Sequence, residues 1–140
     1  MTYDPNNIFA KILRGEIPCE KLYEDEHTLA FMDIMPQAEG HCLVIPKQAS
    51  TGLLDADPAC FAPLLATVQK LARAAKIAMK ADGVTIMQFN GSAAGQTVFH
   101  LHVHIIPRKD GVPLKGHTGQ MEQSALLKAR ADQIRAALSV

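Results

Sequence analysis

The sequence predicts an α+β fold with a mainly antiparallel sheet. Short β-branched runs and longer helical patterns are mixed along the chain without the regular alternation that a parallel βαβ sheet would need. The chain has 140 residues, of which 48% are hydrophobic and 20% charged, so one ordinary domain with a real core is expected. We find no internal repeat, low-complexity block or linker in the sequence.

The first half of the chain predicts one short helix and two strands. A helix is expected within residues 6–16, because the apolar residues at 8, 9, 12 and 13 share one face and Gly15 suits the C-terminal stop. Residues 28–34, "TLAFMDI", alternate well enough for a strand. Residues 41–46, "HCLVIP", form a β-branched-rich run that also predicts a strand.

The second half begins with a long helix, expected between residues 57 and 82 and closed by Gly83. Apolar residues at 61, 64, 65, 68, 71, 75 and 79 follow helical spacing. Pro63 is tolerated only in the first turn, so the regular helix should begin near Cys60. Strands are then predicted over 84–90 and 99–107, and a final helix over 121–138, with Leu127, Ile134 and Leu138 as its apolar stripe.

Composition also excludes several classes of partner. Lys plus Arg equals Asp plus Glu, 14 against 14, which removes the usual electrostatic reason to expect nucleic acid or an anionic membrane. The sequence shows no secretory signal and no membrane-spanning stretch. Its three cysteines include no Cys-x-x-Cys and are expected to be buried or half-buried small residues, so a reducing, cytoplasmic location is predicted.

Three of the six histidines lie at alternate positions in "FHLHVHIIP". In a strand, His100, His102 and His104 would point to one face, about 7 Å apart, while Leu101 and its apolar alternates point to a core. Three imidazoles on one strand face are hard to explain by structure alone. Two chemical interpretations compete: a zinc or iron site built on His-x-His, or phosphorus chemistry with neutral imidazole as the nucleophile.

The preceding segment, "NGSAAGQT" at 90–97, favours phosphorus chemistry. Small residues in a turn present successive backbone N–H groups that form a concave anion site, although a tight loop between strands is the commoner explanation of such a stretch. The P-loop pattern is absent. Joined directly to three aligned histidines, this turn predicts a phosphoryl or nucleotidyl group as substrate.

These residues resemble the histidine-triad (HIT) superfamily, whose signature alternates histidines with apolar residues as "HLHVHII" does. The resemblance extends through "IFAKILRGEIP", "AFMDI", "GHCLVIPK" and "NGSAAGQTVFHLHVHIIPR", and it fades after about Lys109. It is strongest with the Hint-like nucleoside phosphoramidase branch and its bacterial relatives. We therefore expect a HIT domain over 1–110, with a C-terminal loop and helix over 111–140 that belong to the same domain.

The resemblance implies specific roles at the triad. His102 matches the nucleophile that forms a covalent nucleotidyl intermediate, His104 the phosphate contact and His100 the residue that orients the nucleophile. His41 matches a histidine near the triad, although a solvent-facing histidine at a strand start is the alternative.

The resemblance also implies substrate contacts. Asp33 matches the acceptor of the ribose hydroxyls, although a turn-forming role is equally consistent with the sequence, and Ile34 matches a base contact. Asn90, Gly95, Gln96 and Thr97 match the phosphate side and the leaving-group side.

By resemblance, the fold is an antiparallel sheet of about five strands flanked by helices, and two such sheets join in a homodimer through the long helix and an edge strand. The expected function is hydrolysis of purine-nucleoside 5′-phosphoramidates or related adenylates to AMP. The alternatives are a dinucleoside polyphosphate hydrolase, which Arg108 could serve, a nucleotide-binding interaction module and a metal-binding protein. We expect no metal or other cofactor, because Asn7, Ala10 and Ala49 stand near the positions of the zinc ligands in some relatives.

Overall fold

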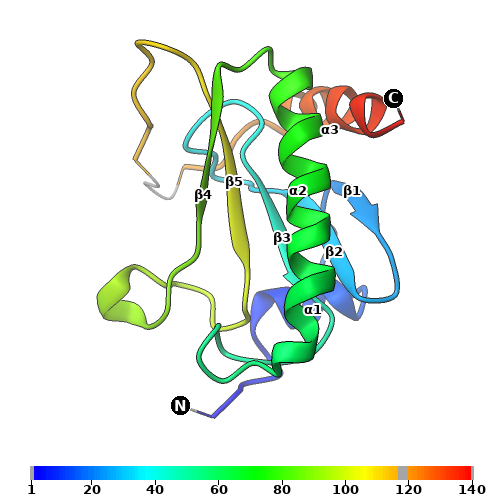
Figure 1. Cartoon of the computed structure of the whole chain (residues 1–140), viewed down its shortest axis with the longest axis vertical. Coiled ribbons are helices and arrows are strands. Elements are labelled where there is room, and N and C mark those ends of the chain that lie inside the picture. Colours follow the sequence, from blue (N-terminus) through cyan, green and yellow to red (C-terminus); the bar gives the residue numbers. More distant parts are fainter. Residues whose placement is uncertain (1, 117–119, 140) are drawn as a thin grey trace.

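The computed structural model describes residues 2–116 and 120–139. Its five strands form one antiparallel sheet in the order β1-β2-β3-β5-β4 (Figure 1). The elements are α1 (Ile8–Leu13), β1 (Lys21–Glu24), β2 (Thr28–Met32), β3 (Cys42–Pro46), a 3-10 turn (Pro58–Cys60), α2 (Phe61–Ala78), β4 (Gly83–Met87), a second 3-10 turn (Ser92–Ala94), β5 (Val103–Arg108) and α3 (Ser124–Leu138). The predicted α+β architecture is confirmed.

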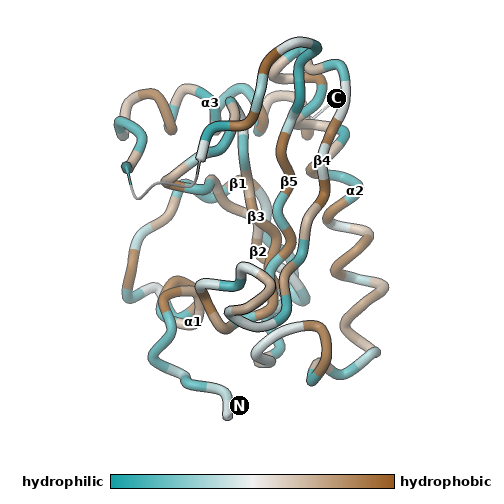
Figure 2. The backbone as a smooth tube through the Cα atoms, turned by 90° about the vertical axis from the view of Figure 1, so that its left-hand side faces the viewer, coloured by the Kyte–Doolittle hydropathy of each residue, from teal (hydrophilic) through white to brown (hydrophobic). Residues whose placement is uncertain are grey.

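The sheet is buried on both faces in its centre. On β3, Cys42 and Val44 belong to the large cluster shared with α2 and α3, whereas Leu43 and Ile45 belong to a smaller cluster that includes Phe9 of α1. Figures 1 and 2 show α2 along one side of the sheet and α1 on the other. The continuous apolar run at 42–46 follows from this two-sided burial.

Helix α2 begins where the proline rule predicted, with the 3-10 turn before it and Pro63 in its first turn. The helical spacing is confirmed, and Leu65, which is 59% exposed, lies at the edge of the apolar stripe. One expectation for this helix was wrong. Gly83 does not close the helix but begins β4; the chain leaves the helix at Lys80, whose φ is 52°, in the left-handed region.

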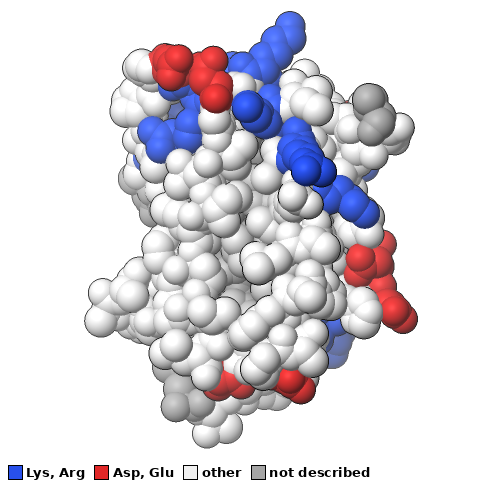
Figure 3. Space-filling model, viewed as in Figure 1, with Lys and Arg blue, Asp and Glu red and all other residues white. Residues whose placement is uncertain are grey.

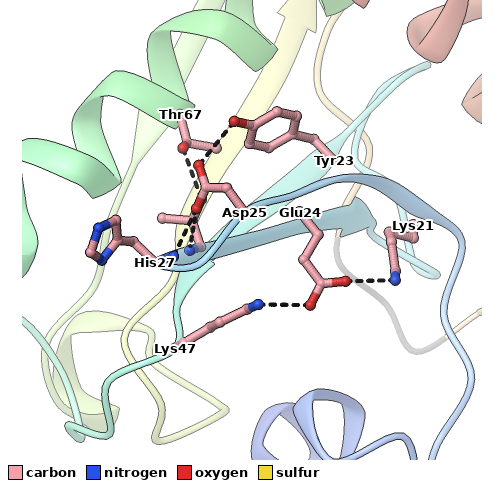
Figure 4. A network of polar contacts seen from close by, with 8 residues as sticks. Lys21, Tyr23, Glu24, Asp25, His27, Lys47 and Thr67 are labelled. Carbon is pink, nitrogen blue, oxygen red and sulfur yellow. Dashed lines mark hydrogen bonds and ion pairs between the residues drawn. The ribbon is translucent and has the colours of Figure 1, made fainter.

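Strand β1 is an element that the sequence did not reveal. It pairs with β2 through a register shift between Lys21 and Tyr23 and buries only Leu22. The turn that follows is held by Asp25 (Figure 4), whose carboxylate accepts hydrogen bonds from the backbone of His27 and Thr28 and from the hydroxyl of Tyr23.

Helix α3 packs on α2 and β1 and buries Leu127, Ala131 and Ile134 in the large cluster, so the predicted stripe is largely correct. Its N-terminal approach contacts the loop between β2 and β3, because Glu122 donates a backbone hydrogen bond to the carbonyl of Ile34. Among the described residues, no helix combines the length and apolar character needed to cross a membrane.

Candidate active site

A cleft lies between α1, the end of β2 and the histidine segment. Most of its lining is apolar, with Phe9, Phe31 and Ile34 among its walls, and His102 and His104 face it. Asp33 and Thr97 also line it. An apolar cleft with a few convergent polar groups suits a flat ring system carrying a polar tail.

The histidine segment is only partly a strand. Strand β5 begins at Val103, not at Phe99, because the preceding backbone turns away to donate a hydrogen bond from Leu101 N to Ser50 O at 3.1 Å. The predicted alternation survives, since Leu101, Val103 and Ile105 all lie in the large cluster. The histidines occupy the opposite side, and the rings of His102 and His104 are 5.1 Å apart.

His102 is held in one tautomer. Its Nδ1 lies 2.7 Å from the carbonyl oxygen of His100, and a carbonyl can only accept, so Nδ1 carries the hydrogen. In the neutral ring, Nε2 therefore keeps its lone pair. Phe9 packs edge-on against the ring at 4.9 Å and fixes its plane. A buried, oriented imidazole with a defined basic nitrogen is suited to nucleophilic attack.

His104 belongs to a second relay. The backbone N–H of Gln37 donates to Nδ1 of His41 at 3.0 Å, so neutral His41 carries its hydrogen on Nε2. That nitrogen lies 2.9 Å from Nδ1 of His104, which must accept. Neutral His104 therefore carries its hydrogen on Nε2, as a donor suited to a phosphoryl oxygen. It is fixed on a central strand, paired with Leu43 on one side and Met87 on the other.

His41 is completely buried, so the solvent-facing alternative is wrong. Its Nε2 lies 3.4 Å from Oδ2 of Asp33. This contact is not a salt bridge, because a second proton on Nδ1 of His41 would meet the N–H of Gln37. Oδ1 of Asp33 accepts the backbone N–H of Met35 at 2.8 Å. Asp33 thus has the turn-forming role, and it also lines the cleft where a ribose contact is predicted.

His100 is more deeply buried than the other two triad histidines, with 1% of its surface exposed. Its Nε2 donates to the carbonyl of Pro46 at 2.8 Å, and its Nδ1 accepts the hydroxyl of Tyr3 at 2.7 Å. Burial lowers the pKa of His100 and of His102, while the hydrogen bonds to the carbonyls of Pro46 and His100 act in the opposite direction. Both rings are therefore neutral near pH 7.

The tautomers of His41 and His104 do not suit a metal ion beside Asp33. Asp33, His41 and His104 each offer a ligand atom within 4.8 Å of the others. Coordination through Nε2 of His41 would require the hydrogen on Nδ1, where the N–H of Gln37 already points. The three side chains therefore form a hydrogen-bond relay and do not fit a metal ion.

The loop at 90–97 braces one wall of the cleft. The amide of Gln96 donates to the carbonyls of Thr51 and Val98 and accepts the N–H of Gly91. Asn90 accepts the N–H of Leu53 and exchanges hydrogen bonds with Gln88. Gly95 has φ 100°, a conformation that favours glycine. Thr97 lines the cleft, whereas substrate contacts by the other three remain predictions.

Sequence reasoning missed three contributors to this site. Tyr3 and Phe9 contact His100 and His102, and the backbone of Gln37 fixes His41. The apolar face of α1 gave a signal for Phe9 as a core residue only. Tyr3 and Gln37 gave none, because the partner of Tyr3 is distant in sequence and the contact of Gln37 is made by its main chain.

A profile of the HIT domain matches residues 14–111, more than half of the chain. The chain belongs to the HIT family. It is also similar in structure to a HIT-like protein of Bartonella henselae, described as involved in cell-cycle regulation and crystallised with an unknown ligand. The two share 54% sequence identity with a TM-score of 0.92, over 97% of this chain and 99% of that one.

Two further HIT relatives carry the names of activities. The adenosine 5′-monophosphoramidase HNT1 of Saccharomyces cerevisiae is 41% identical over 78% of this chain and 66% of its own length. The adenylylsulfatase HINT3 of Arabidopsis thaliana is 39% identical over 91% of this chain, which spans only 64% of that longer protein.

Proposed function

We propose that the chain is a nucleotide hydrolase that cleaves purine-nucleoside 5′-phosphoramidates or related adenylates to AMP through a covalent nucleotidyl-His102. One observation carries the proposal: Nδ1 of His102 is committed to the carbonyl of His100, which leaves a basic Nε2 on a ring that faces the cleft. The names of the yeast and plant relatives support this substrate class.

In the proposed first step, Nε2 of His102 attacks the α-phosphorus. A bond from nitrogen to phosphorus forms, and the bond to the leaving group breaks with its electron pair, which then takes up a proton from solvent. The Nε2–H of His104 donates to a phosphoryl oxygen and stabilises the charge that develops there. In the second step, water attacks the phosphorus and gives up a proton to solvent. The bond from phosphorus to Nε2 breaks with its electron pair on Nε2, so AMP leaves and His102 returns to its neutral form.

The nucleoside part fits the rest of the cleft. Ile34, 40% exposed at its rim, offers an apolar surface to the base. Asp33 uses Oδ1 and Oδ2 within the protein, yet a carboxylate has about four lone-pair sites and can also accept ribose hydroxyls. Thr97 also lines the cleft, and we assign it to the leaving-group side.

The dinucleoside polyphosphate alternative draws no support from Arg108. Its guanidinium donates to the hydroxyl of Thr85 at 3.3 Å, and it pairs with Gly83 at the far end of β5. Arg108 lies four positions after His104, roughly 13 Å along a strand. A longer phosphate chain would have to extend well beyond the cleft to reach it.

A substrate panel tests the proposal. The purified chain is given adenosine 5′-phosphoramidate, an aminoacyl or sulfate adenylate, or a diadenosine polyphosphate, and released AMP is measured. The expected result is a higher kcat/KM for the phosphoramidate or adenylate than for the polyphosphate. The reverse order would favour the polyphosphate hydrolase, and no release from any of them, with AMP still bound, would favour the binding module.

We also propose that the chain acts as a homodimer through the first half of α2 and the edge strand β4. Leu65 on α2 and Ile86 on β4 are 59% and 46% exposed, and β4 has a neighbour on one side only. Figure 3 shows basic side chains over the upper part of this face, while the surface over the first half of α2 is largely uncharged. An apolar, uncharged area beside an open strand edge suits self-association.

A further inference from the structure

The segment before α1, residues 2–7, contacts the histidine segment through Tyr3. It is tied to the helix that follows: the carbonyl of Asp4 accepts two hydrogen bonds from Asn7, and the side chain of Asn7 caps α1 by accepting the N–H of Ala10. Arg14, at the other end of α1, donates to the carbonyl of Pro5 at 2.8 Å. The segment therefore has a fixed course, although it carries no regular structure.

This fixed segment places Tyr3 on His100. The hydroxyl lies 2.7 Å from Nδ1, and the two rings meet edge to face at 5.7 Å. The other nitrogen of His100 faces the carbonyl of Pro46, which can only accept, so Nδ1 bears the lone pair and the tyrosine hydroxyl is the donor. Tyr3 donates to Nδ1, so both nitrogens of this buried ring have a hydrogen-bond partner.

The orientation of His100 matters because its own carbonyl orients His102. The ring of His100 donates to Pro46 at the end of β3, and its main-chain carbonyl accepts from the ring of His102. If His100 changed tautomer, the lone pair of its Nε2 would face the carbonyl oxygen of Pro46. The repulsion would displace His100 and, with it, the main-chain carbonyl that fixes Nδ1 of His102. Small displacements of a reacting group are costly, about 100-fold in rate for about 1 Å.

We propose that Tyr3 is a positioning residue for the nucleophile, which acts by locking His100 in its Nε2–H tautomer. The proposal rests on the proposed hydrolase function for its kinetic test. Tyr3 lies outside the set of residues that line the cleft, so its effect is on turnover and not on nucleotide binding. Its position before residue 14 also lies outside the span that the HIT domain profile matches.

The test compares Tyr3→Phe with Tyr23→Phe. Tyr23 is the chain's other tyrosine, and its hydroxyl donates to Asp25, on the far side of the sheet from the cleft. Each variant keeps the aromatic ring and loses one hydroxyl. The measurements are kcat and KM with adenosine 5′-phosphoramidate, the dissociation constant of AMP, and the imidazole nitrogen shifts of His100 in a long-range proton–nitrogen spectrum.

For Tyr3→Phe we expect kcat to fall about tenfold, the size of one lost buried hydrogen bond, with KM and AMP affinity unchanged. The nitrogen shifts of His100 should move toward those of mixed tautomers. Tyr23→Phe should leave both readouts at their original values. Unchanged kcat in Tyr3→Phe, or an equal loss in both variants, would overturn the positioning role.

The two measurements also separate this inference from the proposed function. If the parent chain releases no AMP, the hydrolase proposal fails, while the nitrogen shifts still report whether Tyr3 fixes His100. Unchanged shifts in Tyr3→Phe would refute the role of Tyr3 even in an active hydrolase. Tyr3→Leu, which removes ring and hydroxyl together, should lower kcat further than Tyr3→Phe if the edge-to-face contact also contributes.

Discussion

His102 and His104 present different nitrogens to the cleft, so their replacements should have different effects. His102→Asn removes the basic Nε2, and we expect turnover to fall by about three orders of magnitude or more, with no trapped nucleotidyl-enzyme. AMP should still bind, because Asp33, Ile34 and Thr97 remain. His104→Ala removes a donor to the phosphoryl group and the acceptor of His41 but leaves the nucleophile in place, so partial activity should survive.

Intact-protein mass after brief exposure to an activated adenylate checks this assignment. The parent chain should gain the mass of one nucleotidyl group, and His102→Asn should not. An adduct that still forms on His102→Asn would place the nucleophile on another residue. The control is His27→Asn, since His27 lies in the exposed turn after β1 and its loss should change neither adduct nor turnover.

The pH profile should reflect burial of the nucleophile. Because burial lowers the pKa of His102, its neutral form persists below the ordinary histidine value of about 6.5. The acidic limb of kcat/KM should therefore lie below that value. A limb at or above it would contradict the buried, neutral nucleophile.

The lowered pKa values of His100 and His102 also make the stability of the fold depend on pH. Folded His100 and His102 bind protons less readily than in the unfolded chain, so the free energy of unfolding should decline as the pH falls below about 6.5 toward the lowered pKa values. Circular dichroism at each pH separates loss of fold from protonation of the nucleophile.

Chelation should have no effect on activity. The relay of Asp33, His41 and His104 uses the nitrogen that a metal would need, and we expect full turnover after prolonged treatment with a strong chelator. Loss of activity that added zinc restores would contradict this tautomer assignment. Magnesium added after chelation serves as the control for non-specific stabilisation of a phosphate substrate.

The sequence predicted the residues of the site better than their partners. The alternation of "HLHVHII" placed the histidines on one side and Leu101, Val103 and Ile105 in the core, which the structure confirms. It could not predict which nitrogen of each ring is free, because the atoms that decide this are the carbonyls of Pro46 and His100 and the amide of Gln37. Such contacts depend on the course of the backbone and leave no trace in residue type.

Among the elements, the turn between β1 and β2 depends on a single carboxylate. Burial raises the pKa of Asp25, but hydrogen bonds from the backbone of His27, the hydroxyl of Tyr23 and Thr28 outweigh it and lower that pKa to about 2. Thr28 also meets Thr67 of α2 at 2.8 Å, hydroxyl to hydroxyl, so the turn is connected to the helix (Figure 4).

Asp25→Asn should therefore lower the free energy of unfolding by about 1 kcal/mol at neutral pH. The loss should shrink as the pH falls from 3.8 toward about 2, where the parent carboxylate becomes protonated as well. The measurement is urea denaturation of parent and variant at neutral pH and at a pH of about 2. The control is Glu26→Gln, at the exposed neighbouring position. Equal stability of parent and Asp25→Asn at neutral pH would show that the turn does not depend on this charge.

The elements that the sequence misjudged share a physical cause. β1 shows no alternation because a register shift interrupts its pairing and only Leu22 is buried. The strand at the triad starts four residues late because Leu101 bonds to Ser50 instead of a neighbouring strand. In both places the backbone departs from regular strand pairing and the local pattern is lost, whereas α2 and α3, with strong periodicity, were found.

At the scale of the whole molecule, we expect a homodimer in solution. Sedimentation at micromolar concentration should give twice the mass of the chain. Leu65→Glu, which puts a charge on the uncharged half of α2, should shift the equilibrium toward monomer. Leu54→Glu is the matched control, because Leu54 is 85% exposed on the loop before α2 and lies outside the proposed interface. A monomeric parent would refute the dimer.

Three of the hydrogen bonds that orient the site imidazoles end on main-chain atoms: the carbonyls of Pro46 and His100 and the amide of Gln37. Every residue type supplies such a carbonyl, and every type except proline supplies the amide. The anchors therefore survive exchange of the side chains around them, and the site can be inherited through long divergence while the backbone keeps its course. That tolerance ends at one substitution in the loop between β2 and β3: Gln37→Pro would remove the N–H that sets the direction of the relay from His41 to His104.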